Sequence, residues 1–264
     1  LGCVAFVSVA IVALLMWGFL LPKMRQDIDV HHKALARSVA GQITSHLMGG
    51  ERQLSALADY IMAREDRPYG QWYALLDTQC GDGDLFETIY IVDDQQQSIE
   101  SVGLAASRRS RREDLVGLDL SGRHIFAKPS SPQGIAWSET FLSTASSRLA
   151  VAVALPFGDH TLMGEIGVDQ ISEFIRHLPV ESELLTIVLD RQNRIVADSK
   201  REFSGRYFDS TGFRSVDDHQ NAELGSLQFE LDGSPYYGTD VSIRRLGWKV
   251  LIAQPLRNIQ QPLR

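Results

Sequence analysis

The first 21 residues carry no charged side chain, and this run constrains the chain more than any other feature. They read LGCVAFVSVAIVALLMWGFLL, and a helix of this length spans roughly 31 Å, close to the hydrocarbon thickness of a bilayer. A cleaved signal peptide usually has a shorter apolar core and a small-residue cleavage site, which we do not find after Leu20. The run therefore predicts a transmembrane helix over residues 1–21, with a signal peptide or a buried helix as the alternatives.

Charge does not orient this predicted span, because Lys23 and Arg25 are followed at once by Asp27 and Asp29. Since the chain opens on Leu1, we expect a fragment whose cytoplasmic leader has been removed.

Apolar residues continue at helical spacing after Pro22 and predict one long helix over residues 22–66. Such a helix would reach roughly 65 Å and would form a stalk leaving the membrane. The pair Gly49 and Gly50 is a weak point where we expect a bend. We also expect two copies of the chain to dimerise through one apolar stripe of the stalk, formed by Leu35, Val39, Ile43 and Leu47.

Beyond Pro68 the pattern changes to strands, and it occurs twice. Tyr90-Ile91-Val92-Asp93 and Ile187-Val188-Leu189-Asp190 each end a strand in an aspartate, followed by a polar turn and a second strand. The sequence therefore predicts an α+β protein with antiparallel sheets in two tandem modules, over residues 67–178 and 179–255. Residues 256–264 are expected to begin a helix leading to a second membrane span.

Composition excludes several classes of function. The 264 residues carry a net charge of −7, the opposite of the basic surplus that nucleic-acid binders use against phosphates. Two cysteines, Cys3 and Cys80, cannot build a disulfide framework or a four-ligand zinc site. Because no nucleophile elbow, Walker loop, dinucleotide fingerprint or metalloprotease motif occurs, we expect no enzyme active site, no metal site and no cofactor.

Two polar clusters have a simple surface interpretation. Arg108-Arg109-Ser110-Arg111-Arg112 could attract phosphates or lipid headgroups, but Glu113 and Asp114 follow, which favours a solvated loop. His31 and His32 are adjacent on the predicted stalk and point about 100° apart, so they cannot chelate one ion together. A solvated helix surface is the expected role of the histidine pair.

A third set of residues has the chemistry of a small-ligand site. Arg123 could hold a carboxylate with its forked guanidinium group, Trp137 could form an apolar wall, and Asp169 could bind an ammonium group. The alternatives are structural: Trp137 in the core, Arg123 paired with a carboxylate, and Asp169 capping a helix that begins at Ile171.

The order of these elements resembles the double Cache (dCache) sensor domains of bacterial transmembrane receptors, which have two PAS-like modules after a long helix. The strings LSGRHIF, IAWSETFLS, RLAVAVALPF and MGEIGVDQIS resemble the core of the membrane-distal module, and GWKVLIAQP resembles the last strand of the proximal one. The resemblance implies that Arg123, Phe126, Trp137, Ser138 and Asp169 occupy pocket positions. The amino-acid-binding branch has an Arg-x-Trp-Tyr cluster, whereas here Arg123 precedes His124-Ile125-Phe126.

The resemblance implies a sensor anchored in the inner membrane, with residues 22–264 in the periplasm and an organic acid or amine as ligand. Its signal would pass down the long helix to a histidine kinase, a cyclic-di-GMP enzyme or a chemotaxis domain outside this chain. Two alternatives stay open: an interaction module with an empty pocket that senses through a partner protein, and a membrane-anchored extracytoplasmic enzyme.

Overall fold

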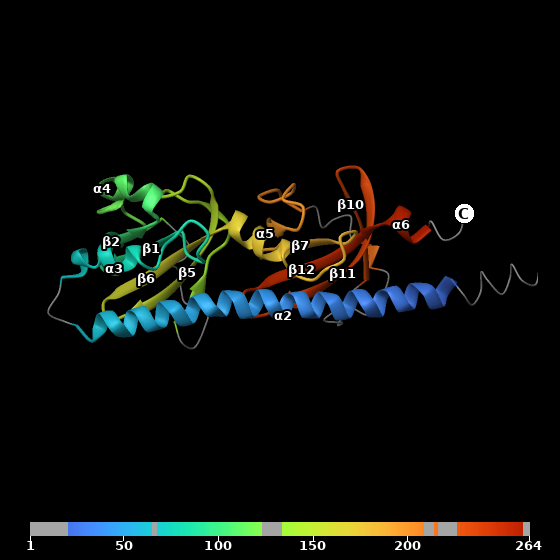
Figure 1. Cartoon of the computed structure of the whole chain (residues 1–264), viewed down its shortest axis with the longest axis horizontal. Helices are drawn as coiled ribbons and strands as arrows, with labels where there is room; N and C mark the ends of the chain where they lie inside the picture. Colours follow the sequence, from blue (N-terminus) through green and yellow to red (C-terminus); the bar gives the residue numbers. More distant parts are fainter. Residues whose placement is uncertain (1–20, 65–67, 123–133, 209–213, 216–225, 261–264) are drawn as a thin grey trace, which may run out of the picture.

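One long helix lies along two antiparallel sheets (Figure 1). The computed structural model describes residues 21–64, 68–122, 134–208, 214–215 and 226–260. The helix, α2 (Leu21–Met62), has 42 residues and agrees with the predicted stalk. Residues 1–20 of the predicted membrane span lie outside the described residues, and within the described part no helix is long and apolar enough to cross a membrane.

The first sheet has the strand order β2-β1-β6-β5-β3, with β4 also paired to β5. Its strands are β1 (Thr88–Asp93), β2 (Ser98–Leu104), β3 (Ala136–Trp137), β4 (Phe141–Leu142), β5 (Leu149–Phe157) and β6 (His160–Gly167). Three short helices precede or follow the first two strands: α3 (Tyr73–Asp77), η3 (Ala106–Arg111) and α4 (Arg112–Leu115), with a single turn η2 (Tyr69–Gln71) before them.

The second sheet repeats this arrangement in the order β8-β7-β12-β11-β10-β9. Its strands are β7 (Leu185–Leu189), β8 (Ile195–Asp198), β9 (Arg214–Ser215), β10 (Ser226–Leu231), β11 (Ser234–Ile243) and β12 (Trp248–Pro255), followed by α6 (Leu256–Gln260). The helix α5 (Val168–Arg176) joins the two sheets. The predicted α+β class and the internal repeat are thus observed as two sheets of matching order.

The repeated aspartate has a similar hydrogen-bond geometry in both units. In the first unit Asp93 Oδ1 accepts hydrogen bonds from the backbone N–H groups of Gln95 and Gln96, at 2.7 and 2.8 Å. In the second unit Asp190 Oδ1 accepts from the N–H groups of Gln192 and Arg194, both at 2.9 Å. The aspartate closes each turn by bonding to the backbone just after it, which explains why the same residue ends both strands.

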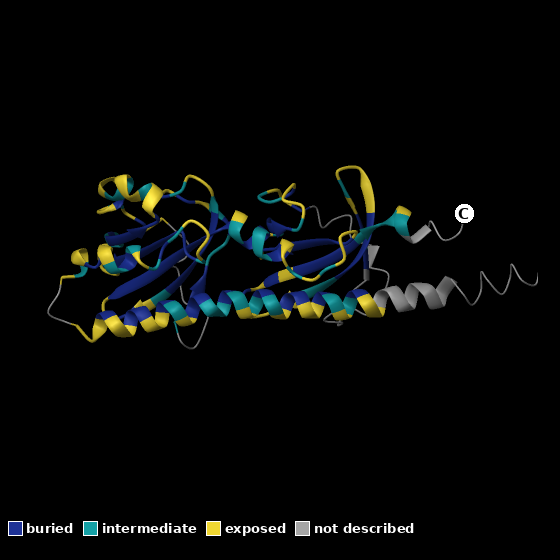
Figure 2. Cartoon of the chain, viewed as in Figure 1, coloured by how far each residue is buried: buried dark blue, intermediate teal, exposed yellow. Residues whose placement is uncertain are grey.

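The apolar stripe of α2 is buried against this chain's own sheets. Val39, Ile43 and Leu47 are at most 1% exposed and belong to one core with Val151 and Val153 of the first sheet and Val250 and Ile252 of the second. The stripe of Leu35, Val39, Ile43 and Leu47 is therefore not the surface for a dimer, because three of these residues are buried in the core and Leu35 packs against it, while a homodimer through the stalk helix itself stays a prediction. Figure 2 shows buried residues on the sheets and on the side of α2 that faces them.

The predicted bend at Gly49 and Gly50 is not observed, since α2 continues through both glycines. Gly50 has a packing role instead. A Cβ atom placed on Gly50 would lie 2.8 Å from Leu85 Cδ2 and 3.0 Å from Phe86 Cζ, whereas a Cβ on Gly49 would meet nothing within 4 Å. Gly50 lets the helix approach the start of the first sheet closely.

This difference between adjacent glycines predicts opposite effects of one substitution. Gly50→Leu should lower the free energy of unfolding by about 1–3 kcal/mol, because the new side chain overpacks the contact with Leu85 and Phe86. Gly49→Leu is the matched control and should raise stability by up to about 1 kcal/mol, since leucine favours helix and has room. Urea unfolding followed by circular dichroism measures both, and equal effects would contradict the packing role.

Candidate functional site

The two faces of the first sheet have different compositions. On β5, Val151 and Val153 pack toward α2, while the alternate residues Ala152 and Ala154 lie on the opposite face with Tyr90 and Met163. We call this opposite side the far face. The small alanines at its centre are buried in a second core together with Leu104, Leu115 and Leu120, which cover this face.

Buried polar groups lie among these small residues on the far face. Glu165 on β6 is 2% exposed, and its Oε2 accepts a hydrogen bond from Ser143 Oγ at 2.6 Å. Thr88 lies directly opposite Glu165 in the sheet register and is fully buried. Among the described residues, Thr88 Oγ1 has no hydrogen-bond partner. A buried hydroxyl without a partner costs free energy, so a polar ligand group at this place would be stabilised.

Sequence patterns did not single out Glu165 or Thr88. The sequence did contain a signal for them. In GEIG (164–167) and AVAVA (150–154), side chains alternate between the two faces, and the pairing of β5 with β6 places Glu165 on the same face as the alanines. Charged residues are rarely buried without a specific role or partner, so Glu165 marks this face as the candidate site.

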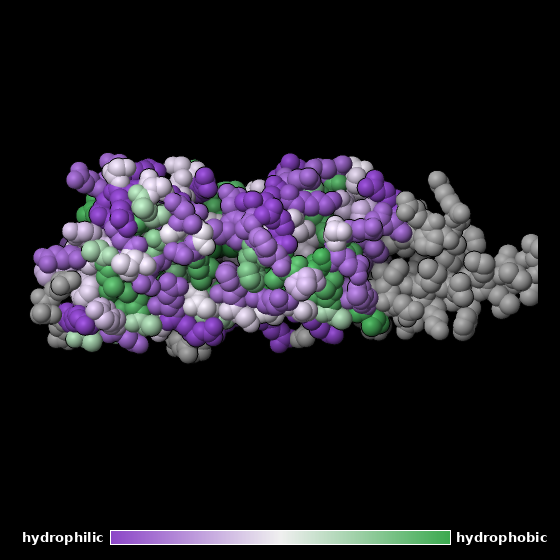
Figure 3. Space-filling view, viewed as in Figure 1, coloured by the Kyte–Doolittle hydropathy of each residue, from purple (hydrophilic) through white to green (hydrophobic). Residues whose placement is uncertain are grey.

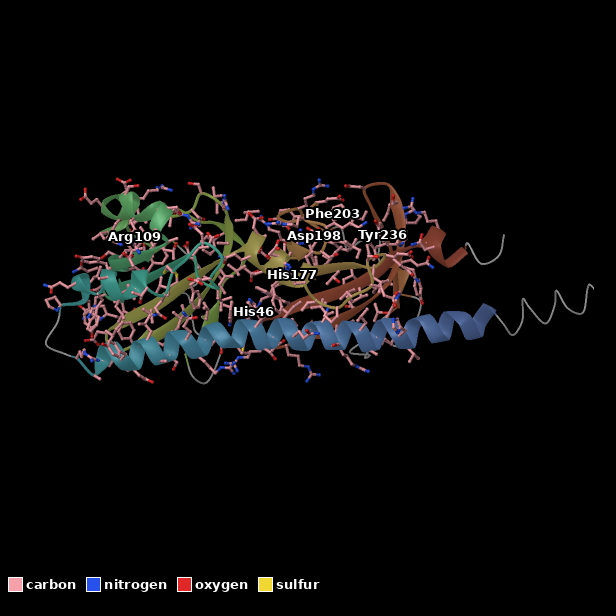
Figure 4. All side chains as sticks on the ribbon, viewed as in Figure 1. His46, Arg109, His177, Asp198, Phe203 and Tyr236 are labelled. Atoms are coloured by element: carbon pink, nitrogen blue, oxygen red, sulfur yellow. The ribbon has the colours of Figure 1, made fainter. Side chains whose placement is uncertain are left out.

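The arginine run lies on the far side of the first sheet from α2, as the label of Arg109 in Figure 4 shows. It forms η3 and α4 rather than the solvated loop that its composition favoured, and each arginine has a partner. Arg108 pairs with the buried Glu87 at 3.1 Å, Arg109 and Arg112 pair with Asp77, and Arg111 donates to the Ala145 carbonyl at 2.8 Å. These pairings fix the two short helices on the module.

The five predicted pocket residues do not form one described cluster. Arg123 and Phe126 lie outside the described residues. Ser138 is half-buried and pairs with β5: its N–H donates to the Ala152 carbonyl at 2.8 Å, and its Oγ accepts from the Ala152 N–H at 2.8 Å. This side-chain bond interrupts the ladder, and the predicted strand over 135–141 is observed as the separate strands β3 and β4.

Asp169 lies in the first turn of α5, and its side chain is 57% exposed. Because α5 begins at Val168 with Gly167 as its N-cap, the expectation that Asp169 caps a helix beginning at Ile171 is wrong. The carboxylate still lies where the helix dipole favours negative charge. Its nearest described cation is Arg148, 3.9 Å away.

Trp137 points to the α2 side and joins the two modules. Its Nε1–H donates to Glu51 Oε1 on α2 at 2.8 Å, and the same carboxylate forms an ion pair with Arg245, which lies between β11 and β12. The indole of Trp137 also meets Trp248 of β12 edge to face, with ring centroids 6.1 Å apart. Glu51 is 6% exposed. One buried carboxylate on the long helix therefore holds a residue from each sheet.

A second contact joins the sheets directly. Thr140, beside β4, donates from its hydroxyl to Asp190 Oδ2 at 3.0 Å, and Asp190 is the turn-closing aspartate of the second unit. The helix and the two sheets are thus connected by polar bonds as well as by the shared core.

Cys80 has none of the properties of a catalytic nucleophile. Its side chain is buried, and burial raises the pKa of the thiol to about 12. The reactive thiolate is therefore absent at neutral pH.

The comparisons with known proteins give the same fold. No family model and no curated protein sequence matches the chain. The ligand-binding domain of the Pseudomonas fluorescens chemoreceptor CtaA, solved with L-isoleucine, superposes with a TM-score of 0.64 at 12% identity, covering 92% of this chain and 98% of that one. The ligand-binding domain of Mlp24 with asparagine gives 0.63 at 11% identity, over 91% and 97%.

A third match is the ligand-binding domain of the Pseudomonas aeruginosa amino acid chemoreceptor PctB with L-Arg, at TM-score 0.62 and 16% identity, over 87% and 96%. Because these matches cover 87–92% of this chain, the resemblance to the double Cache domain is confirmed at the level of the fold. Identities this low establish the fold alone.

The Glu51 contacts predict a stability effect that depends on the hydrogen bond more than on the charge. Glu51→Ala should cost about 1–3 kcal/mol of unfolding free energy, because it leaves the buried Trp137 N–H without an acceptor. Glu51→Gln keeps an acceptor oxygen and should cost less, since Arg245 is 45% exposed and returns to water. Urea unfolding of both variants tests this order, and an equal loss would show that the charge dominates.

Proposed function

We propose that this chain is the extracytoplasmic small-molecule sensing region of a bacterial transmembrane receptor. The observation that carries the proposal is the fold match to chemoreceptor ligand-binding domains over 87–92% of this chain. These neighbours were solved with asparagine, L-arginine and L-isoleucine. The chain itself carries no catalytic step in this proposal.

The ligand binds over the far face of the first sheet. The support comes from the buried carboxylate of Glu165 and from the hydroxyl of Thr88 that lacks a described partner, which lie on the same face as the small side chains of Ala152 and Ala154. Arg123 and Phe126 belong to the proposed site by resemblance, and Asp169 would contribute at its edge. Trp137 and Ser138 would support the site through the packing of β3 rather than by direct contact.

The ligand is an amine-bearing molecule. A carboxylate in a buried place accepts stronger hydrogen bonds from a positively charged donor such as an ammonium group than from a neutral one. Of the two ligand chemistries open from the sequence, the described residues therefore favour the amine over a simple organic acid, which would place like charges together at Glu165.

The signal passes along α2, which contacts both sheets. In this proposal residues 1–21 anchor the chain in the inner membrane, residues 22–264 are periplasmic, and the output is a histidine kinase or cyclic-di-GMP domain outside this chain. A ligand changes the output only if it binds one arrangement of the modules more tightly than the other. The junction at Glu51, Trp137 and Arg245 is where such a change would reach the helix.

A thermal-shift screen of the 264-residue chain in mild detergent tests the proposal, with amino acids, other amines and organic acids as ligands. A ligand at 100 times its dissociation constant adds about 2.7 kcal/mol of stability and raises the melting temperature measurably. Glu165→Gln should weaken the binding of an amine ligand at least about tenfold, because a hydrogen bond to a charged group is lost. Glu230→Gln, at an exposed position of β10, is the matched control and should change nothing.

Failure can take two forms. If an amine binds equally well to Glu165→Gln, the assignment of the far face is wrong. If no compound in any of the three classes binds, direct sensing by this chain is refuted in favour of the interaction module that acts through a partner protein.

A further inference from the structure

Three potential metal ligands come together at one end of the first sheet. Asp93, Glu100 and His160 each offer one ligand atom, and these atoms all lie within 4.8 Å of one another. The residues belong to three neighbouring strands in the order β2-β1-β6. Since 93, 100 and 160 form no metal-binding motif along the chain, only the fold brings them together.

The strand register explains the convergence. Asp93 ends β1 directly opposite His160, which begins β6. Glu100 lies at a β-bulge of β2, between Ile99 and Ser101, which pair with Val92 and Ile91. A bulge leaves one residue outside the regular ladder and re-aims its side chain, here toward the end of the neighbouring strands.

The imidazole is held in place and is incompletely satisfied. His160 is 9% exposed, and its ring lies against Tyr69 with centroids 3.9 Å apart. Its Nε2 is 3.2 Å from Glu100 Oε2, whereas its buried Nδ1 has no hydrogen-bond partner among the described residues. If the proton is on Nε2, the buried Nδ1 is a hydrogen-bond acceptor without a donor. If the proton is on Nδ1, the lone pair of Nε2 faces the negatively charged carboxylate of Glu100, which is repulsive. A cation at Nε2 replaces that repulsion by attraction to both the lone pair and the carboxylate, and Nδ1–H is then the one ring group without a described partner.

The Asp93 carboxylate has a second oxygen that could bind an ion. Asp93 uses Oδ1 for the turn N–H groups, so Oδ2 is available without disturbing the turn. Asp93 and Glu100 are half-buried, so an ion can reach them from solvent and they can adjust their positions.

We propose that Asp93, Glu100 and His160 form a binding site for a divalent transition-metal ion of the Zn²⁺ type. One imidazole nitrogen and two carboxylate oxygens, with water in the fourth position, are a ligand set that Zn²⁺ accepts. Two ligands of a tetrahedral zinc ion lie about 3.3 Å apart at bond lengths of about 2.0–2.1 Å, and Nε2 and Glu100 Oε2 are 3.2 Å apart.

The site is separate from the proposed ligand site. Along β1 and β6, Asp93 and His160 alternate onto the face that carries Ile91 and Leu162, opposite the far face of Tyr90 and Met163. β6 leads directly into α5, so His160 lies at the end of the sheet remote from the second module (Figure 1). The metal would bind at this tip whether or not a small molecule binds elsewhere.

The test is zinc binding by the 264-residue chain, purified in mild detergent without a polyhistidine tag and measured by competition with a chromophoric chelator. We expect each chain to remove one Zn²⁺ ion from the chelator. Glu100→Gln and Asp93→Asn, which keep the shape and the hydrogen-bond acceptors, should each weaken zinc binding at least about tenfold. Circular dichroism and the melting temperature without metal confirm that each variant is folded.

A matched control comes from another histidine–carboxylate pair. Glu181 Oε1 lies 3.4 Å from His31 Nε2 on an exposed surface, with no third ligand in the described residues around it. Glu181→Gln should leave zinc binding unchanged. An absence of stoichiometric binding, or an equal loss in Glu181→Gln, would overturn the proposal, and neither result depends on whether the chain binds an amine.

Discussion

The packing of α2 against both sheets is the constraint on which the rest of the structure depends. A sheet with one apolar face must cover it, and here a single helix covers parts of two sheets. The core is continuous from Ala36 to Ile61 of the helix and includes Trp137 of the first sheet and Trp248 of the second. Neither sheet has a separate core on that side, so the helix determines how the modules lie relative to one another. Figure 3 shows a mainly hydrophilic surface on the face in view, with small hydrophobic patches spread over both modules.

Polar contacts make that arrangement specific. Apolar packing alone tolerates small shifts, but Glu51 must meet the indole N–H of Trp137 and the guanidinium of Arg245 at once. The hydrogen bond from Thr140 to Asp190 joins the two sheets directly, without involving α2. The junction therefore fixes the position of each module relative to the helix more narrowly than an apolar contact would.

The sequence predicted the elements well where local patterns decide them. Helical spacing located α2, and strand–aspartate–turn repetition located the equivalent strands of the two units, because both depend on neighbours a few residues apart. The pattern could not distinguish which surface the stripe of Val39, Ile43 and Leu47 would cover, since a partner chain and this chain's own sheets present the same apolar chemistry.

Long-range contacts account for the parts of the site that the sequence did not reveal. The neighbours of Glu165, Thr88 and Glu51, and the cluster of Asp93, Glu100 and His160, come from residues distant in the chain. The arginine run illustrates the same limit, because its partners Asp77 and Glu87 precede it by more than 20 residues. Composition made a solvated loop the simplest interpretation, and only tertiary pairing made it two ordered helices.

Because α2 is long, a small tilt of the helix displaces its far end by much more than the residues near the pivot. Its 42 residues span about 63 Å at about 1.5 Å per residue, and an unbroken helix tilts as a rod. A tilt of about 2° around a pivot near one end would displace the other end by about 2 Å at that length. Gly50, which brings the rod close to Leu85 and Phe86, lies in the second half of the helix. A sub-ångström adjustment there can thus become an ångström-scale movement at Leu21.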